Sequence, residues 1–318
     1  MAYTAGDTIL DDEYNAFVGN SSSPYGYNHF AGTGAGVYGL NQTSIATVSA
    51  GGTINASSWN SLFTGLDNIA NHTNVSITSS SVSAGDEIAV RAALISDLAS
   101  LAAAVAAGST SATAISSPVA AGTSTNAATW NGTSTIERSI TFANNATMRA
   151  FFNAGGYIRI DPSCITGIDG LKDDVFNDLT ATAVGNLDIG AHVSTRSGSG
   201  ETPTTDGLAN GFHELSTGYT VLLKLTSDNS GYTSNTVEIS AKLDAAPATA
   251  TVLTIKMYSV DGDNDDTYTA GNTDGAPANP NEAPRMTLAL LEAYPTDGEG
   301  LAADIRALSN AEVSNSTS

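Results

Sequence analysis

Cysteine is nearly absent from this chain. Cys164 is the single cysteine among 318 residues, which excludes an internal disulfide and a metal cluster built on cysteines. No histidine and asparagine signature of the kind that activates a nucleophilic thiol accompanies it. We therefore expect Cys164 to be a small buried side chain rather than a reactive one.

Basic residues are the second shortage. The chain has 11 lysines and arginines against 32 aspartates and glutamates, for a formal net charge of -21. The only lysines are Lys172, Lys224, Lys242 and Lys256. Because affinity for nucleic acid rests on cationic contacts with phosphates, a chain this negative is not expected to bind nucleic acid. It also repels anionic lipid surfaces.

Long apolar segments are missing as well. The longest apolar run lies between residues 99 and 107, and it is too short and too rich in alanine to cross a bilayer. The first residues contain no basic region followed by an apolar stretch, so we predict no signal peptide. We expect a protein that is made in a cytoplasm and is not inserted into a membrane.

The sequence does contain a phrase that occurs twice near its start, 45 residues apart. Ala5–Ile9 followed by Tyr14–Phe17 returns as Ala50–Ile54 followed by Trp59–Phe63, and Ala84–Ile88 begins a weaker third copy. Each copy indicates a turn, one buried aliphatic residue and a helix that opens with an aromatic residue. Small repeated units of this kind are typical of scaffolds rather than of catalysts.

The second copy predicts a helix with a defined start. Asn55 stands where an N-cap belongs, directly after Ile54. Apolar residues then recur at three- and four-residue steps and form one face of the helix. They are Trp59, Leu62, Phe63, Leu66 and Ile69.

An alanine-rich helix is expected over residues 84–108. Leu94, Leu98, Leu101 and Val105 form a short seam of the kind that lines a coiled coil. Two alternatives follow from this seam. It is the axis of a homo-oligomer, a trimer or a hexamer, or the helix folds back on its own chain.

The chain divides further by composition. Residues 1–83 form the repeated N-terminal region, which we interpret as a docking region, and residues 109–135 are small and polar and predict a linker. Residues 136–300 alternate as strands and predict an antiparallel β-sandwich. Residues 301–318 predict a frayed helix and a polar tail. The expected fold is mainly β, with an α-helical N-terminal part made of small helix-turn repeats.

The sharpest candidate for a binding site is an acidic loop. Asp261, Asp263 and Asp265 place carboxylates at alternate positions, which can turn several oxygens toward one calcium ion. The loop is not an EF-hand, because Asp266 stands where that motif needs glycine and Asn272 where it needs glutamate. A solvated acidic hairpin is the alternative. No other cofactor is expected.

Enzymatic chemistry has little support in the sequence. The four histidines show no zinc-binding spacing, and there is no G-x-S-x-G motif, so we predict no catalytic residue. A glycan-cleaving enzyme stays as an alternative, since its paired carboxylates leave no local trace. Tyr219, Tyr232 and Tyr268 would be the aromatic residues that stack on a sugar if the chain binds glycans.

One segment in the middle of the chain is more specific. Met148–Ile160, preceded by Ser139–Phe142, resembles a signature in many virion structural proteins of tailed bacteriophages. Those proteins often open with a G-D-x-I…Y-N phrase and a glycine-rich segment, followed by a second opening and a helix that ends near a histidine. The counterparts here are Gly6–Ile9, Tyr14-Asn15, Gly32–Gly39, Thr53-Ile54, Trp59-Asn60 and His72.

The residues of this segment also predict its local structure. Gly155-Gly156 permits a left-handed exit from a short helix. Ile158 and Ile160 then face the core of the sheet, and Arg159 faces out.

The resemblance implies a non-enzymatic virion component that is tail-associated and multimeric. Its expected partners are copies of itself and other virion proteins, and its expected location is the virion. Two alternatives stay open: a receptor-binding fibre whose C-terminal sandwich grips a host surface glycan, and a capsid decoration protein. Residues 84–135 have no counterpart in the family.

Overall fold

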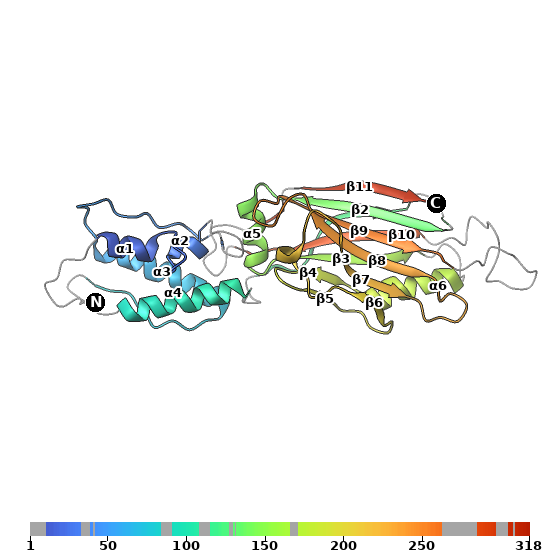
Figure 1. Cartoon of the computed structure of the whole chain (residues 1–318), viewed down its shortest axis with the longest axis horizontal. Coiled ribbons are helices and arrows are strands. Elements are labelled where there is room, and N and C mark those ends of the chain that lie inside the picture. The colour runs from blue at the N-terminus through green and yellow to red at the C-terminus, as the bar shows by residue number, and fades with distance from the viewer. Residues whose placement is uncertain are drawn as a thin grey trace, which may run out of the picture. The chain divides into compact units, whose positions relative to one another are not determined.

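The computed structural model describes residues 11–32, 39–40, 42–83, 91–107, 115–126, 130, 132–165, 171–262, 285–296, 305–307 and 309–318. The chain forms two compact units, which are described separately (Figure 1). The first comprises residues 1–117, 144–156 and 294–306, and the second comprises residues 118–143, 157–293 and 307–318.

The first unit is helical. Helices α1 (Asp11–Val18) and α2 (Tyr27–Phe30) are short, α3 (Ala56–Thr73) and α4 (Arg91–Ala106) are long, and α5 (Asn145–Asn153) belongs to the same unit. Helix α2 contacts α1, α3 and α4, and α3 contacts α4, so these four helices form one packed group (Figure 1).

The aromatic residues of the repeats form the core of this group. Tyr14 from the first repeat and Trp59 from the second meet edge to face, with ring centroids 5.3 Å apart. Phe17 and Phe63 each lie 6.0 Å from Trp59 between centroids. The aromatic residue that opens the helix of one copy therefore packs against the corresponding residue of the other copy.

The start and the apolar face of α3 are as predicted. The Asn55 side chain accepts a hydrogen bond from the Ser58 N–H at 3.0 Å, which caps the helix. The five residues expected on one face are all buried: Trp59, Leu62, Phe63, Leu66 and Ile69.

The seam of α4 faces the interior of the same unit. Leu94, Leu98, Leu101 and Val105 are each at most 2% exposed, and α4 packs on α2 and α3. The second alternative, a helix folded back on its own chain, therefore holds. An oligomer axis along this seam is wrong, because the side chains that would form it are already buried.

The second unit is the predicted antiparallel sandwich. The sheet orders are β11-β2-β9-β8-β7-β6 and β1-β10-β3-β4-β5. The six-stranded sheet contains β2 (Thr133–Thr141), β6 (Pro203–Asp206), β7 (Thr220–Thr226), β8 (Thr236–Leu243), β9 (Val252–Val260) and β11 (Ser309–Thr317). The five-stranded sheet contains β1 (Val119–Thr125), β3 (Tyr157–Ile165), β4 (Leu187–Ile189), β5 (Ser194–Arg196) and β10 (Arg285–Ala293).

A helical segment closes one side of the sandwich. Helix α6 (Leu171–Asn177) runs into the π-helical segment η2 (Asp178–Val184), which contacts β3 of one sheet and β7 and β8 of the other. Trp130 packs edge to face on Phe176 of α6, with centroids 5.0 Å apart. Both side chains are buried.

Two strands lie where none was expected. Strand β1 occupies part of the predicted linker at 109–135, and β11 occupies part of the predicted tail at 301–318. Both are edge strands, each paired with one neighbour, so their residues are small and polar like those of a linker. Composition could not separate an edge strand from a loop here.

The segment from 148 to 160 has the predicted local structure, but its helix groups with the other unit. Gly155 has φ of 91°, the left-handed exit, and Ile158 and Ile160 are fully buried. Residues 144–156, however, belong to the first unit rather than to the sandwich. The sandwich therefore does not span 136–300 as expected. It comprises residues 118–143, 157–293 and 307–318, and residues 144–156 are not part of it.

Candidate functional site

Three asparagines in the first unit hold extended chain segments by their backbone. Asn15 of α1 donates to the Val48 carbonyl and accepts from the Val48 N–H, both at 2.8 Å. Asn60 of α3 makes the same pair of bonds with Val82, at 2.9 and 2.8 Å. An asparagine amide has the same donor and acceptor as a peptide group, so it pairs with an extended chain as a neighbouring strand does. We call each such pair an amide clamp.

A second clamp lies three or four residues earlier on each segment. Asn28 of α2 donates to the Ile45 carbonyl at 2.7 Å and accepts from its N–H at 3.0 Å. Asp97 of α4, which is 5% exposed, accepts from the N–H groups of Thr78 and Ser79. The segments 42–50 and 75–83, which we call arms, are thus each fixed at two points.

The clamps follow the repeat. Val48 and Val82 each stand two residues before the Ala-Gly of a repeat, and the clamping asparagine stands six residues after the isoleucine of the preceding copy. Asn15 therefore holds the arm that leads to α3, and Asn60 holds the arm that leads to α4. Each arm is held by the helix before it, which links successive repeats.

We did not predict these asparagines from the sequence. The available signal was the aromatic-Asn dipeptide that recurs as Tyr14-Asn15, Tyr27-Asn28 and Trp59-Asn60. The aromatic residue packs inward, and the next residue then projects to the side of the helix where an arm passes.

A hollow of about 720 Å³ lies between the first arm and α3. Tyr27 and Gly65 contribute to its lining, and a β-carbon at residue 65 would lie only 2.7 Å from the Tyr27 ring. Most of the other lining residues are polar. These residues are Gln42, Thr43, Ser44, Ile45, Ala46, Ser57, Asn60, Ser61, Thr64 and Asn68. We call this hollow the arm groove.

The arm groove presents hydrogen-bonding groups that have no partner among the described residues. Gln42 is 4% exposed, yet its buried Nε2 has no acceptor there. The Asn68 side chain and the peptide groups of Ser44 and Ala46 make no hydrogen bond within that part of the chain either. A buried amide without a partner costs free energy, so the groove is suited to a ligand that supplies backbone-like donors and acceptors.

Replacing Asn60 by alanine should loosen the second arm. Two hydrogen bonds to Val82 are lost, and we expect a decrease in the free energy of unfolding of about 1–3 kcal/mol. Asn71→Ala is the matched control, because Asn71 lies exposed on the same helix. Urea unfolding followed by circular dichroism gives both values, and equal stability of the two variants would contradict the clamp.

The predicted calcium ligands are only partly described. Asp261 is described, whereas Asp263 and Asp265 lie outside the described residues. The Asp261 carboxylate forms an ion pair with the Lys172 ammonium, and its side chain is fully buried. A cation already faces this carboxylate, and the described residues contain no cluster that could hold a metal ion. The calcium site at Asp261, Asp263 and Asp265 therefore stays a prediction.

We expect calcium to leave the melting temperature of the protein unchanged. The Lys172 ammonium compensates the charge of Asp261, so a divalent ion beside it would meet electrostatic repulsion. A specific site at 100 times its Kd would add about 2.7 kcal/mol to the free energy of unfolding. Thermal melting in millimolar calcium and in chelator makes the comparison. A clear rise with calcium, absent with magnesium, would show that the loop binds calcium.

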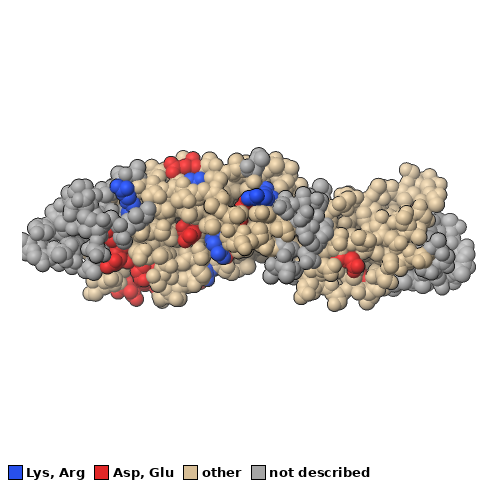
Figure 2. Space-filling model, turned by 180° about the vertical axis from the view of Figure 1, so that it is seen from behind, with Lys and Arg blue, Asp and Glu red and all other residues tan. Residues whose placement is uncertain are grey.

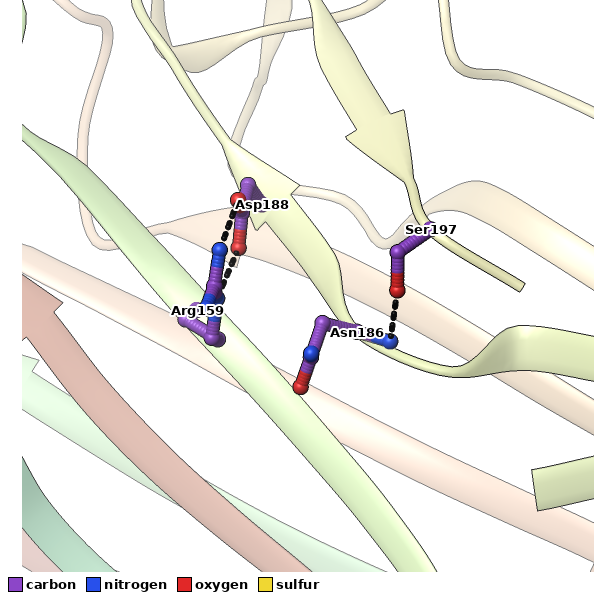
Figure 3. Close-up of polar contacts among 4 residues, drawn as sticks. All are labelled: Arg159, Asn186, Asp188 and Ser197. Carbon is purple, nitrogen blue, oxygen red and sulfur yellow. Dashed lines mark hydrogen bonds and ion pairs between the residues drawn. The ribbon is translucent and has the colours of Figure 1, made fainter. Parts of the chain in front are cut away.

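Arg159 faces out of the sheet as predicted, and a carboxylate holds it. Its guanidinium donates two hydrogen bonds to Asp188 on the adjacent strand β4, both at 2.8 Å (Figure 3). The bond to Asp188 raises the pKa of Arg159. Beside this pair, the Ser197 hydroxyl accepts from the Asn186 N–H at 2.9 Å. These contacts stabilise the pairing of β3, β4 and β5 and leave the guanidinium engaged.

Two histidines that lie far apart in the sequence, His192 and His213, contact each other. The His192 and His213 rings stack with centroids 4.8 Å apart, and His192 Nδ1 lies 3.0 Å from Glu214 Oε1. Glu214 belongs to the short 3₁₀ helix η3 (Phe212–Glu214), and its other oxygen accepts from the Gly211 N–H. This cluster joins the turn after β4 to η3.

Two of the three tyrosines considered for sugar stacking are engaged within the protein itself. Tyr232 is 4% exposed, and Tyr268 lies outside the described residues. The Tyr219 ring is contacted by the ammonium groups of Lys242 and Lys256, at 4.4 and 4.2 Å from the centroid. Charged side chains on the face in Figure 2 are scattered among uncharged ones and do not form one patch.

Cys164 is buried, as expected. It is 6% exposed, and desolvation, together with the charge of nearby Asp173, raises the pKa of its thiol to about 12. The thiol therefore stays protonated at neutral pH and does not act as a nucleophile.

No helix among the described residues is long and apolar enough to cross a membrane. Comparisons with protein-family models, with curated proteins and with solved structures find no match to the chain.

Proposed function

We propose that this chain is a non-enzymatic structural component of a bacteriophage virion, tail-associated, that assembles with copies of itself and with other virion proteins. The single observation that carries the proposal is the series of amide clamps. Asparagine side chains of the first unit bind the backbone of the two arms. The arm groove is also lined by side-chain amides and hydroxyls that can bind a backbone. Binding of extended chain through backbone hydrogen bonds is a common mode of assembly.

The resemblance of residues 148–160 to a signature of phage virion proteins supports the part of the proposal that places the chain in a virion. The expected assembly is a symmetric homo-oligomer, a trimer or a hexamer, with the N-terminal repeats docking on the particle. Since the α4 seam is buried, the contacts between copies would use other surfaces.

The test has two parts. Light scattering on the purified chain should give the mass of a trimer or a hexamer at micromolar concentration. Antibody labelling in electron microscopy should place the chain on virus particles and at their tails. A chain that stays monomeric and never sediments with particles would overturn the proposal, and labelling of the head alone would favour a capsid decoration protein instead.

A further inference from the structure

The arm groove has the chemistry of a seat for an extended peptide. Gln42 and Asn68 are amides without a partner in the described chain, and Gln42 is almost fully buried. Ser61 and Thr64 line the groove on α3 and offer short hydroxyl side chains. Elsewhere in the same unit, amides of this kind pair with the backbone of an arm, so the same type of ligand suits this groove.

The repeat identifies a segment of this type. Tyr3–Ile9 matches the end of both described arms, with Tyr3 two residues before an Ala-Gly, as Val48 and Val82 are. Its side chains are mostly short, which lets a backbone approach a groove wall closely. Like the other copies, it leads directly into a helix, here α1. It lies outside the described residues.

The clamp positions of the described helices are not open to this segment. Asn15 and Asn60 already hold the arms at Val48 and Val82. The third repeat carries Leu94 at the corresponding position, and a leucine side chain cannot pair with a peptide group. Among the described residues that line the arm groove, Gln42 and Asn68 carry amides that hold no arm.

We infer that the Tyr3–Ile9 segment of one copy binds in the arm groove of a second copy. The inference rests on the proposed assembly function and names the contact that carries it. In the described repeats, the asparagine that pairs with Val48 or Val82 belongs to a helix other than the one that the arm enters, and here the receiving helix is α3 of a neighbour. Because arm and groove are different surfaces, the contact closes into a ring when each arm reaches the next copy and into a two-fold dimer when two copies exchange arms.

Cross-linking between differently labelled chains tests this contact. One full-length variant carries Thr4→Cys and the other carries Ser61→Cys, and a short bis-maleimide joins thiols that lie close together. Cys164 is buried and stays unmodified. The matched control pairs Thr4→Cys with Ser100→Cys, an exposed serine on α4 of the same unit.

We expect the Thr4→Cys and Ser61→Cys mixture to give a covalent dimer in about tenfold higher yield than the control mixture, because the bound arm raises the effective concentration of the two thiols. Equal yields would overturn the inference. A further variant carries both Thr4→Cys and Ser61→Cys in one chain. If cross-links form only within single chains of this variant, the arm binds its own groove and the inference is also overturned.

Light scattering separates this inference from the proposed function. A variant without residues 2–9 should fall to a monomer. If that variant keeps the oligomer of the full chain, the arm contact is wrong and the proposed assembly stands. If the full chain is itself monomeric and never found on particles, both are wrong.

Discussion

Replacing Trp59 by alanine is expected to lower the free energy of unfolding of the first unit by about 3–5 kcal/mol. The indole is 3% exposed and contacts the rings of Tyr14, Phe17 and Phe63. Its removal leaves a cavity where α1 meets α3, and the cost of such a cavity adds to the lost burial of the indole. Most of the stability of this unit should be lost, because whole domains are stable by about 5–15 kcal/mol.

The two tryptophans make this measurement specific. Trp59 lies in the first unit and Trp130 in the second, and the chain has no other tryptophan. After Trp59→Ala, fluorescence reports the sandwich through Trp130, while the helical signal in circular dichroism reports the first unit. We expect the helical signal to unfold at lower urea and the Trp130 transition to stay where it is.

Trp59→Phe is the control, since a phenyl ring keeps part of the aromatic contact with Tyr14. It should cost clearly less than the alanine variant. A loss under about 1 kcal/mol for Trp59→Ala would show that the repeated aromatic residues do not form the core of this unit.

The elements that local pattern determines could be predicted from the sequence. Trp59 and Ile69 share a buried face because helix geometry alone places them there, and Ile158 and Ile160 face the core because strand residues alternate. The Asn55 cap depends on contacts within one turn. Such features need no knowledge of distant partners.

The candidate site could not be predicted in this way. Asn15 and Val48 are 33 residues apart, and nothing local distinguishes an asparagine that holds an arm from one that faces water. The seam of α4 has the same pattern whether another chain or its own chain covers it. Strand β11 exists because β2 offers it a free edge, pairing Asn310 with Ile140, and its own residues favour a strand only weakly.

Replacing Arg138 by alanine is expected to destabilise the sandwich by about 3 kcal/mol or more, since several charged hydrogen bonds are lost together. Arg138 lies on β2 and is 6% exposed. Its guanidinium donates to the Thr123 carbonyl at 2.9 Å, to the Ser124 hydroxyl at 2.6 Å and to the Asn310 side chain at 2.6 Å. One side chain thus joins β1 of the five-stranded sheet to β2 and β11 of the other.

Two further variants separate this role from a simple loss of charge. Arg138→Lys keeps the charge but carries its donors on one nitrogen, which cannot take the places of both Nη1 and Nη2, so it should recover less than half of the loss. Gly122→Ala leaves Arg138 in place but puts a β-carbon 2.2 Å from its Nη2 and from the Asn310 Oδ1, and should destabilise the same junction. Trp130 fluorescence during urea unfolding reports each effect, with the helical signal of the first unit as the internal control. If Arg138→Lys is as stable as the original chain, a single positive charge is sufficient at this position and the fork of hydrogen bonds is not what joins the sheets. If all three variants weaken the sandwich in the expected order, Arg138 holds the two sheets together through β1 and β11. These are the strands that lie in the predicted linker and the predicted tail.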